Sequence, residues 1–169
     1  LGRFSTMTDL IDSVGVDVSR YFFVMRSMES HLDFDLTLAA RQSSENPVFY
    51  LQYAHARICS IFRKVADSDI VYEPTIFDAG EYDDESVQLM KIISRFSEEI
   101  IDAASVLEVH RIASYLLRLA QQFHRFYTVN RIIGDDSNVT RKLLTIAHAA
   151  RITLKNGLSL LGVGAPEQM

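Results

Sequence analysis

Apolar residues recur at three- and four-residue steps through three long stretches of the chain. This spacing keeps side chains on one face of a helix, so each stretch predicts an amphipathic helix. No alternating run is long enough to predict a strand, and the pattern therefore indicates an all-α bundle of long helices. The apolar stripes comprise Leu51, Ala54, Ile58, Ile61 and Val65 in a helix over 47–65; Ile112, Leu116, Leu119, Phe123 and Phe126 in a helix over 107–131; and Leu143, Ala147, Ala150, Leu154, Leu158 and Leu161 in a helix that Asp136 or Ser137 caps and Gly162 ends.

Capping and breaking residues place shorter elements around these three helices. Gly15 is a plausible C-cap for a first short helix, and Asp17 a plausible N-cap for the next. The segment 43–47, Ser-Ser-Glu-Asn-Pro, predicts a helix start with proline in the first turn. The remaining expectations are short helices over 8–14, 18–27, 36–42, 85–96 and 98–104, an extended segment over 28–35 and a loop over 67–84.

Length and composition bound the class of protein. The 169 residues, 48% of them hydrophobic, suffice for a sizeable core in one or two compact units. Cys59 is the only cysteine, which excludes an intrachain disulfide and a CxxC zinc pair and fits a reducing, cytoplasmic location. No apolar run has the length of a membrane span, and the N-terminus lacks a signal-peptide pattern, so we expect no membrane association. Leu1-Gly2-Arg3-Phe4 reads like the interior of a longer chain.

Charge is segregated along the sequence. Residues 67–102 hold 11 acids and two bases, a net charge of −9, whereas the rest holds 15 bases and 11 acids, a net charge of +4. The overall charge of −5 argues against nucleic-acid binding, but its distribution leaves most of the surface free of a repulsive acidic field.

One face of the helix over 47–65 combines aromatic rings with a cation. At about 100° per residue, Tyr50, Tyr53 and Arg57 fall within about 60° of one another, at the border of the apolar stripe. Phenol rings and guanidinium planes stack with unpaired bases, and their donors bind base edges or phosphates. Two half-buried packing tyrosines with their hydroxyls at the rim are the simpler alternative, and the pattern alone leaves it open.

The helix over 107–131 carries a second set of candidates. Arg111, Arg118 and Arg125 repeat every seven residues and form a basic line. Near the end of the helix, His124, Tyr127 and Arg131 repeat the three- and four-residue spacing. For these arginines the alternative is an exposed face that pairs with nearby acids, or complements the negative C-terminal end of the helix.

The sequence offers little for catalysis or metal binding. The run from His31 to Asp35 holds one histidine and two aspartates, but the spacing is loose and no further ligand cluster supports it, so we expect no metal. His55 and His148 are single helical histidines, expected to be hydrogen-bonded packing residues. Cys59, beside the apolar stripe, is expected to be an inert buried thiol. No glycine-rich phosphate loop and no nucleophile–base arrangement is present, so no catalytic residue is expected.

Four blocks of the sequence resemble arginyl-tRNA synthetases, and they occur in the family's order. The stretch 45–57, ENPVFYLQYAHAR, is similar to the signature at the start of the family's anticodon-binding domain. The stretches 15–27 and 30–39 look like the connector before that domain, and 123–132 and 154–169 look like its later helices and chain end. The segment 65–107 matches poorly.

The resemblance implies an all-α bundle of the class I synthetase anticodon-binding type, with connector helices over 1–44 after a catalytic domain and the binding bundle over 45–169. It implies recognition of the tRNA anticodon loop as the C-terminal part of an arginine–tRNA ligase. The site residues that it implies are Tyr50, Tyr53, Arg57, Tyr127, Arg131 and Met169, with residue type variable at Arg131. Gln52 and His55 are signature residues for which packing and helix-to-helix hydrogen bonds are expected.

The same resemblance implies that ATP and magnesium serve the full-length parent, whereas the chain itself needs no cofactor and should be inactive alone. The expected partners are tRNA and the missing catalytic domain, and the expected state is a monomer. A helical module for oligomerisation or partner docking through the apolar stripes is the main alternative function. A free-standing enzyme is a third, which the lack of a catalytic constellation disfavours.

Overall fold

A computed structural model describes residues 6–30, 34–74 and 82–169, and within these residues every regular element is a helix, with no strand. The predicted all-α class is confirmed. In chain order the helices are α1 (Met7–Val14), α2 (Val16–Val24), α3 (Leu36–Ala39), α4 (Pro47–Ala66), α5 (Asp84–Ser94), α6 (Phe96–Ser105), α7 (His110–Val129) and α8 (Ser137–Leu160). The segments 1–4 and 31–33 and part of the predicted loop over 67–84 lie outside the described residues.

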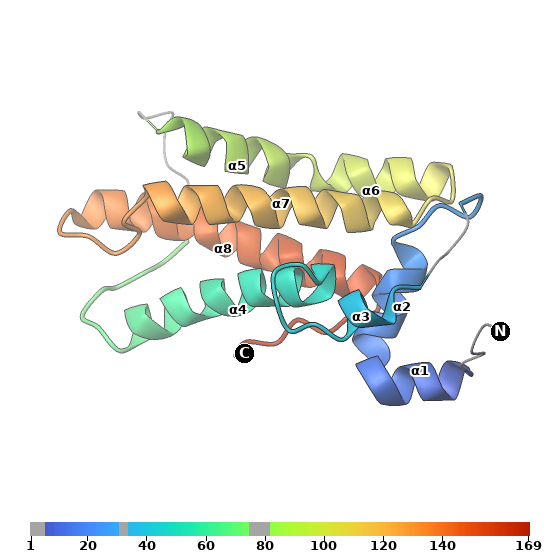
Figure 1. Cartoon of the computed structure of the whole chain (residues 1–169). Helices are drawn as coiled ribbons and strands as arrows, with labels where there is room; N and C mark the ends of the chain where they lie inside the picture. The colour runs from blue at the N-terminus through green and yellow to red at the C-terminus, as the bar shows by residue number, and fades with distance from the viewer. Residues whose placement is uncertain (1–5, 31–33, 75–81) are drawn as a thin grey trace.

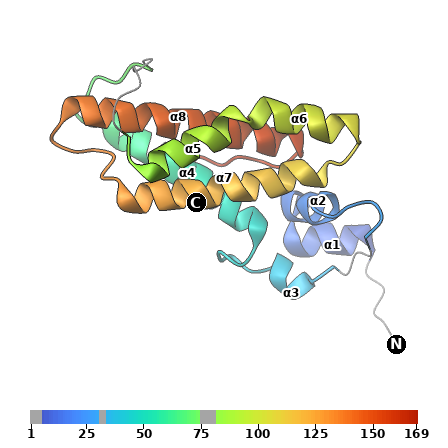
Figure 2. The ribbon, with the colours of Figure 1, turned by 90° about the horizontal axis from the view of Figure 1, so that it is seen from above.

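Helices α4, α5, α7 and α8 form a bundle of long, roughly aligned helices, with α6 continuing the line of α5 along α7 (Figure 1). Seen from above in Figure 2, α1, α2 and α3 lie together beside one end of this bundle. The three apolar stripes predicted from the sequence face inward, and every residue assigned to them is buried. Burial of side chains of this size is worth about 1.5–3 kcal/mol each, so the stripes supply much of the stability of the bundle.

Helices α7 and α8 approach each other closely at Gly157. A Cβ atom at this position would fall 2.4 Å from Cδ2 of Leu116, which is fully buried on α7. Because glycine has no side chain, the Leu116 side chain can pack directly against the α8 backbone. Tyr115, next to Leu116, donates a hydrogen bond from its hydroxyl to the Ile92 carbonyl of α5 at 3.0 Å. The two contacts bring three helices together around the middle of α7.

Helix α4 begins at a buried cap. The side-chain Oδ1 of Asn46 accepts from the Val48 N–H at 3.0 Å, and its Nδ2 donates to the backbone carbonyls of Ala39 and Arg41, both at 2.9 Å. Pro47 occupies the first turn, as the sequence predicts. One side chain therefore caps α4 and also ties it to the end of α3.

Several helix boundaries differ from the sequence prediction. Helix α2 begins at Val16, and its N-cap is Gly15, so the assignment of Asp17 as an N-cap is wrong. Helix α7 begins at His110 and ends at Val129, inside the predicted 107–131, and Leu107 has a φ of 57° that a helix cannot accommodate. Helix α3 stops at Ala39, short of residue 42.

Candidate nucleic-acid interface

The guanidinium of Arg57 lies between two tyrosine rings. Its Cζ atom is 4.7 Å from the ring centroid of Tyr53, one turn earlier on α4, and 5.0 Å from that of Tyr127 on α7. Its Nη2 also donates to the Tyr53 hydroxyl at 2.5 Å. Tyr53 and Tyr127 are 37% and 36% exposed. Cation–π attraction therefore orders three side chains from two helices while leaving ring surface open to a ligand.

These side chains line a groove of about 380 Å³ between α4, α7 and the end of the chain. Its α4 wall also contains Ser60, Arg63 and Lys64, which the sequence analysis did not single out. They follow Arg57 at three-, six- and seven-residue steps, so the helical periodicity that found Tyr53 and Arg57 could have found them too. The groove contains three cationic side chains and no carboxylate side chain among its described lining residues, which suits a polyanion.

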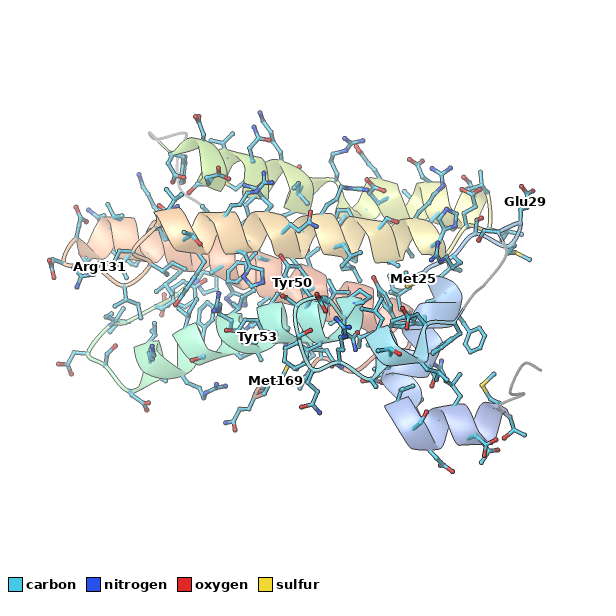
Figure 3. The ribbon with its side chains drawn as sticks, viewed as in Figure 1. Met25, Glu29, Tyr50, Tyr53, Arg131 and Met169 are labelled. Atoms are coloured by element: carbon cyan, nitrogen blue, oxygen red, sulfur yellow. The ribbon has the colours of Figure 1, made fainter. Side chains whose placement is uncertain are left out.

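The chain end folds back along α4 and delivers Met169 and Gln168 to the groove (Figure 3). Polar side chains hold this tail by its backbone. His55 Nδ1 lies 2.8 Å from the Pro166 carbonyl oxygen, and Arg63 donates to the Glu167 carbonyl at 2.8 Å. Because the bonds go to main-chain atoms, they fix the path of the tail whatever side chains it carries.

Gln52 and Asp17 hold the start of the same tail. Gln52 Nε2 donates to Asp17 Oδ2 at 2.9 Å and to the Gly164 carbonyl at 3.0 Å, and the Gly164 N–H donates to Asp17 Oδ2 at 3.0 Å. Asp17 therefore joins α2, α4 and the tail. The expectation of helix-to-helix hydrogen bonding holds for Gln52, whereas His55 binds the tail.

His124 of α7 supports the groove from behind. Its ring centroid lies 5.0 Å from that of Tyr50 and 6.1 Å from that of Tyr53, and its Nδ1 is 3.4 Å from Nη1 of Arg57. Burial, together with the nearby Arg57 charge, lowers the pKa of His124 to about 4. The imidazole is therefore neutral at physiological pH, and its Nδ1 can accept from Arg57, since a guanidinium can only donate.

Tyr50 faces a different hollow from the Arg57 groove. It lines a depression of about 420 Å³ with Glu85 of α5 and a row of α7 residues. Burial raises the pKa of Tyr50, so its hydroxyl remains protonated at neutral pH. His124 lies between the two hollows, in contact with Tyr50 on one side and Arg57 on the other. The α7 residues of the Tyr50 hollow are Gln121, His124, Arg125, Thr128 and Val129.

The structure gathers Tyr53, Arg57, Tyr127 and Met169 in one groove but does not bring Arg131 to them. Arg131 is exposed just after α7, and in Figure 3 it lies at one end of the bundle, whereas Met169 lies near the middle of its length, close to Tyr53. Helix α7 ends at Val129, so the three- and four-residue spacing that linked Arg131 to Tyr127 does not extend to it.

The basic line predicted on α7 is mostly neutralised. Arg111 is paired with Glu108, and Arg118 Nη2 donates to Glu99 of α6 at 2.9 Å. For these two residues the structure favours pairing with acids, the alternative that the sequence had left open.

The remaining candidates from the sequence are Cys59, the single histidines and the possible metal ligands. Cys59 is buried, and burial raises the pKa of its thiol, as expected for an inert cysteine. Nδ1 of His148 lies 3.1 Å from the hydroxyl oxygen of Tyr72.

Among the described residues no group of three histidine, cysteine, aspartate or glutamate side chains is arranged to hold a metal, and His31 and Asp33 lie outside them. Within the same residues, no helix has both the length and the apolar character to traverse a bilayer.

The all-helical fold is shared with solved arginyl-tRNA synthetases and belongs to a known class of helical domains. Residues 51–169 match the DALR anticodon binding domain family, and the chain is a member of that family.

Several similar proteins carry the name arginine–tRNA ligase. An arginine–tRNA ligase of Symbiobacterium thermophilum is 49% identical over 99% of this chain, and one of Bacillus licheniformis is 44% identical over 99%. The chain spans only 30% of the length of each relative. Among solved structures, an arginyl-tRNA synthetase from Campylobacter jejuni matches 99% of this chain and 36% of its own, with a TM-score of 0.86 and 30% identity. Thermus thermophilus arginyl-tRNA synthetase matches 93% of this chain and 27% of its own, with a TM-score of 0.76 and 26% identity.

Proposed function

We propose that this chain recognises the anticodon loop of a tRNA. The observation that carries the proposal is the arrangement of Tyr53, Arg57 and Tyr127, in which two partly exposed rings flank one guanidinium in an open groove. Membership of an anticodon-binding family supports the same function. Unpaired bases stack on tyrosine rings and guanidinium planes, and each stacked base is worth about 1–3 kcal/mol.

The groove is suited to reading a base as well as stacking it. Arg57 donates to the Tyr53 hydroxyl, which leaves other guanidinium N–H groups free for base edges or phosphate. Met169, which is 56% exposed, offers a flexible apolar surface against which a base can pack. A wrong base that leaves these polar groups unpaired would bind more weakly. Arg131 is proposed only as a peripheral contact, since it lies outside the groove.

The relatives point to a larger protein. We infer that this chain acts as part of an arginine–tRNA ligase, with connector helices over 1–44 and the binding bundle over 45–169. In that setting the activity, and its requirement for ATP and magnesium, belong to the rest of the protein, which we expect to be a cytoplasmic monomer. The names of the relatives support this assignment.

The alternative of an oligomerisation module acting through the apolar stripes has no support in the structure. All stripe residues are buried within the bundle and are not available to a partner.

Binding of an arginine-tRNA anticodon stem-loop to the chain, followed by fluorescence anisotropy, tests the proposal. Arg57→Ala and Tyr53→Ala should each weaken binding by about 5- to 150-fold, the factor that corresponds to one lost stacking contact. Arg95→Ala is the matched control, because Arg95 is an exposed arginine paired with Glu98 and outside the groove. Equal affinities for wild type, R57A and Y53A, with all variants folded by circular dichroism, would refute anticodon recognition by this groove.

A further inference from the structure

We propose that the hollow lined by Tyr50, Gln121 and Arg125 is a second RNA subsite, which binds a backbone phosphate next to the nucleotide held in the Arg57 groove. The inference rests on the proposed function and deepens it, because it assigns a separate role to one side of the α4–α7 pair. Tyr50 would then contact the strand at a different place from Tyr53 and Tyr127. The groove and the hollow together would bind two neighbouring positions of one unstacked strand.

The charges along α7 single out Arg125. Arg111 and Arg118 lie seven and fourteen residues earlier on the same helix, and each forms an ion pair, with Glu108 and Glu99 respectively. Arg125 is exposed and forms no ion pair or hydrogen bond within the described part of the chain. An arginine without an internal carboxylate partner retains its full charge and five donors for a phosphate.

The remaining lining residues supply donors on the same side. The Tyr50 hydroxyl stays protonated, because burial raises its pKa, and can donate to an anionic oxygen. Gln121 is exposed on α7, one turn before Arg125, and carries two amide donors. The Thr128 hydroxyl already donates to the His124 carbonyl at 2.8 Å and so is not counted among them.

Glu85 of α5 also lines the hollow and is the one carboxylate among its described lining residues. Its carboxylate accepts a hydrogen bond from Gln122 Nε2 at 2.5 Å and forms no ion pair with Arg125. The guanidinium of Arg125 is therefore open to a phosphate, although a carboxylate lies in the same hollow.

The position of His124 argues that the two subsites serve adjacent nucleotides. Its ring contacts Tyr50 on the side of the hollow, and its Nδ1 faces Arg57 on the side of the groove. One side chain thus forms the partition between the two sites. A strand whose base stacks beside Arg57 would have to pass this partition, which brings a neighbouring phosphate to the hollow.

The test compares Arg125→Gln with Arg118→Gln in salt titrations of stem-loop binding. Both substitutions remove one exposed arginine charge from α7, but only Arg125 lines the hollow. Loss of one phosphate contact on a single strand should reduce the slope of log K against log salt by about 0.7. We expect this reduction, with weaker binding, for R125Q, whereas R118Q should keep the wild-type slope. Equal slopes for R125Q and wild type, or equal changes in R125Q and R118Q, would overturn the proposal.

A second measurement locates the phosphate. A set of stem-loops is prepared, each with one neutral methylphosphonate linkage at a different loop position. At one position the modified stem-loop should bind wild type more weakly than the unmodified RNA does. The same modification should not weaken binding to R125Q. If no linkage behaves in this way, the phosphate assignment is wrong. The R57A variant in the same assay separates the two proposals: if R57A binds like wild type, the proposed function fails, and if R57A is weak but R125Q is normal, only the second subsite fails.

Discussion

Nδ1 of His124 lies 3.4 Å from Nη1 of Arg57, the guanidinium that also lies against the rings of Tyr53 and Tyr127. His124 thus positions Arg57 without having to touch RNA itself. The Nε2 atom of the same ring is buried and has no hydrogen-bond partner within the described residues. His124→Phe keeps a ring of similar size and removes the acceptor. We expect stem-loop affinity to fall by about 10-fold, the effect of losing one hydrogen bond to a charged group, as measured by anisotropy.

A double-mutant cycle decides whether His124 acts through Arg57. In the Arg57→Ala background, His124→Phe should cause little further loss of affinity, because the group that it positions is gone. Leu116→Val, at a fully buried position two turns earlier on α7, serves as a packing control and should show additive behaviour. Additive losses for H124F and R57A would show that His124 is a general packing residue.

The pKa of His124 predicts how stability depends on pH. Burial and the Arg57 charge lower this pKa from 6.5 to about 4, so between these values the ring is neutral when folded and takes up a proton on unfolding. The contribution of the neutral His124 ring to the free energy of unfolding is fully present above about pH 6.5. It is lost as the pH falls toward 4, by at most about 1.4 kcal/mol per pH unit. Burial also lowers the pKa values of His55 and His148, which add in the same direction.

Urea unfolding of wild type and His124→Phe at pH 7 and pH 5 isolates this contribution. The wild type should lose more free energy of unfolding than H124F over this interval, and the difference between the two losses is the share of His124. Parallel losses in both proteins would assign the pH dependence to His55, His148 and other groups. The measurement needs no RNA, so it tests the buried environment of the ring separately from its role in binding.

Helical geometry explains how much of the site the sequence could predict. Tyr53 and Arg57 lie one turn apart on a long, strongly periodic helix, so their shared face follows from the sequence. Tyr127 follows from the same spacing rule on the helix that contains it, whereas Met169 came only from the resemblance to a known family. The pairing of α4 with α7, which brings Arg57 between two rings, depends on tertiary packing that no local pattern encodes.

The helix end and the cap that differ from the prediction have local physical causes. The helix predicted over 107–131 ends at Val129, so the spacing rule that links Arg131 to Tyr127 ends there, and the role of Arg131 stays a prediction. Asp17 has the residue type of an N-cap, yet it accepts from Gln52 and from the Gly164 N–H, a contact 147 residues distant in sequence. Contacts of such range leave no signal in local composition.

Removal of Gln168 and Met169 tests the role of the tail. Both residues are exposed, so their deletion should leave the melting temperature unchanged. Affinity for the stem-loop should nevertheless fall, because both line the Arg57 groove. Deletion from Val163 onward is the contrasting variant: Val163 is only 4% exposed, and its loss should cost about 1.5–3 kcal/mol of stability. Undiminished affinity after removal of residues 168 and 169 would exclude the tail from the binding site.

Gly157→Ala tests the close approach of α7 and α8 at Leu116. The new methyl group would lie 2.4 Å from Cδ2 and 3.1 Å from Cγ of Leu116, a fully buried side chain with little room to move. Overpacking of this kind costs about 1–3 kcal/mol, although alanine is otherwise the better helix former by about 1 kcal/mol. Urea denaturation should therefore show net destabilisation. Gly134→Ala, whose Cβ would meet its nearest atom only at 3.7 Å, should be close to neutral, and destabilisation by both variants alike would mean that contact with Leu116 is not the cause.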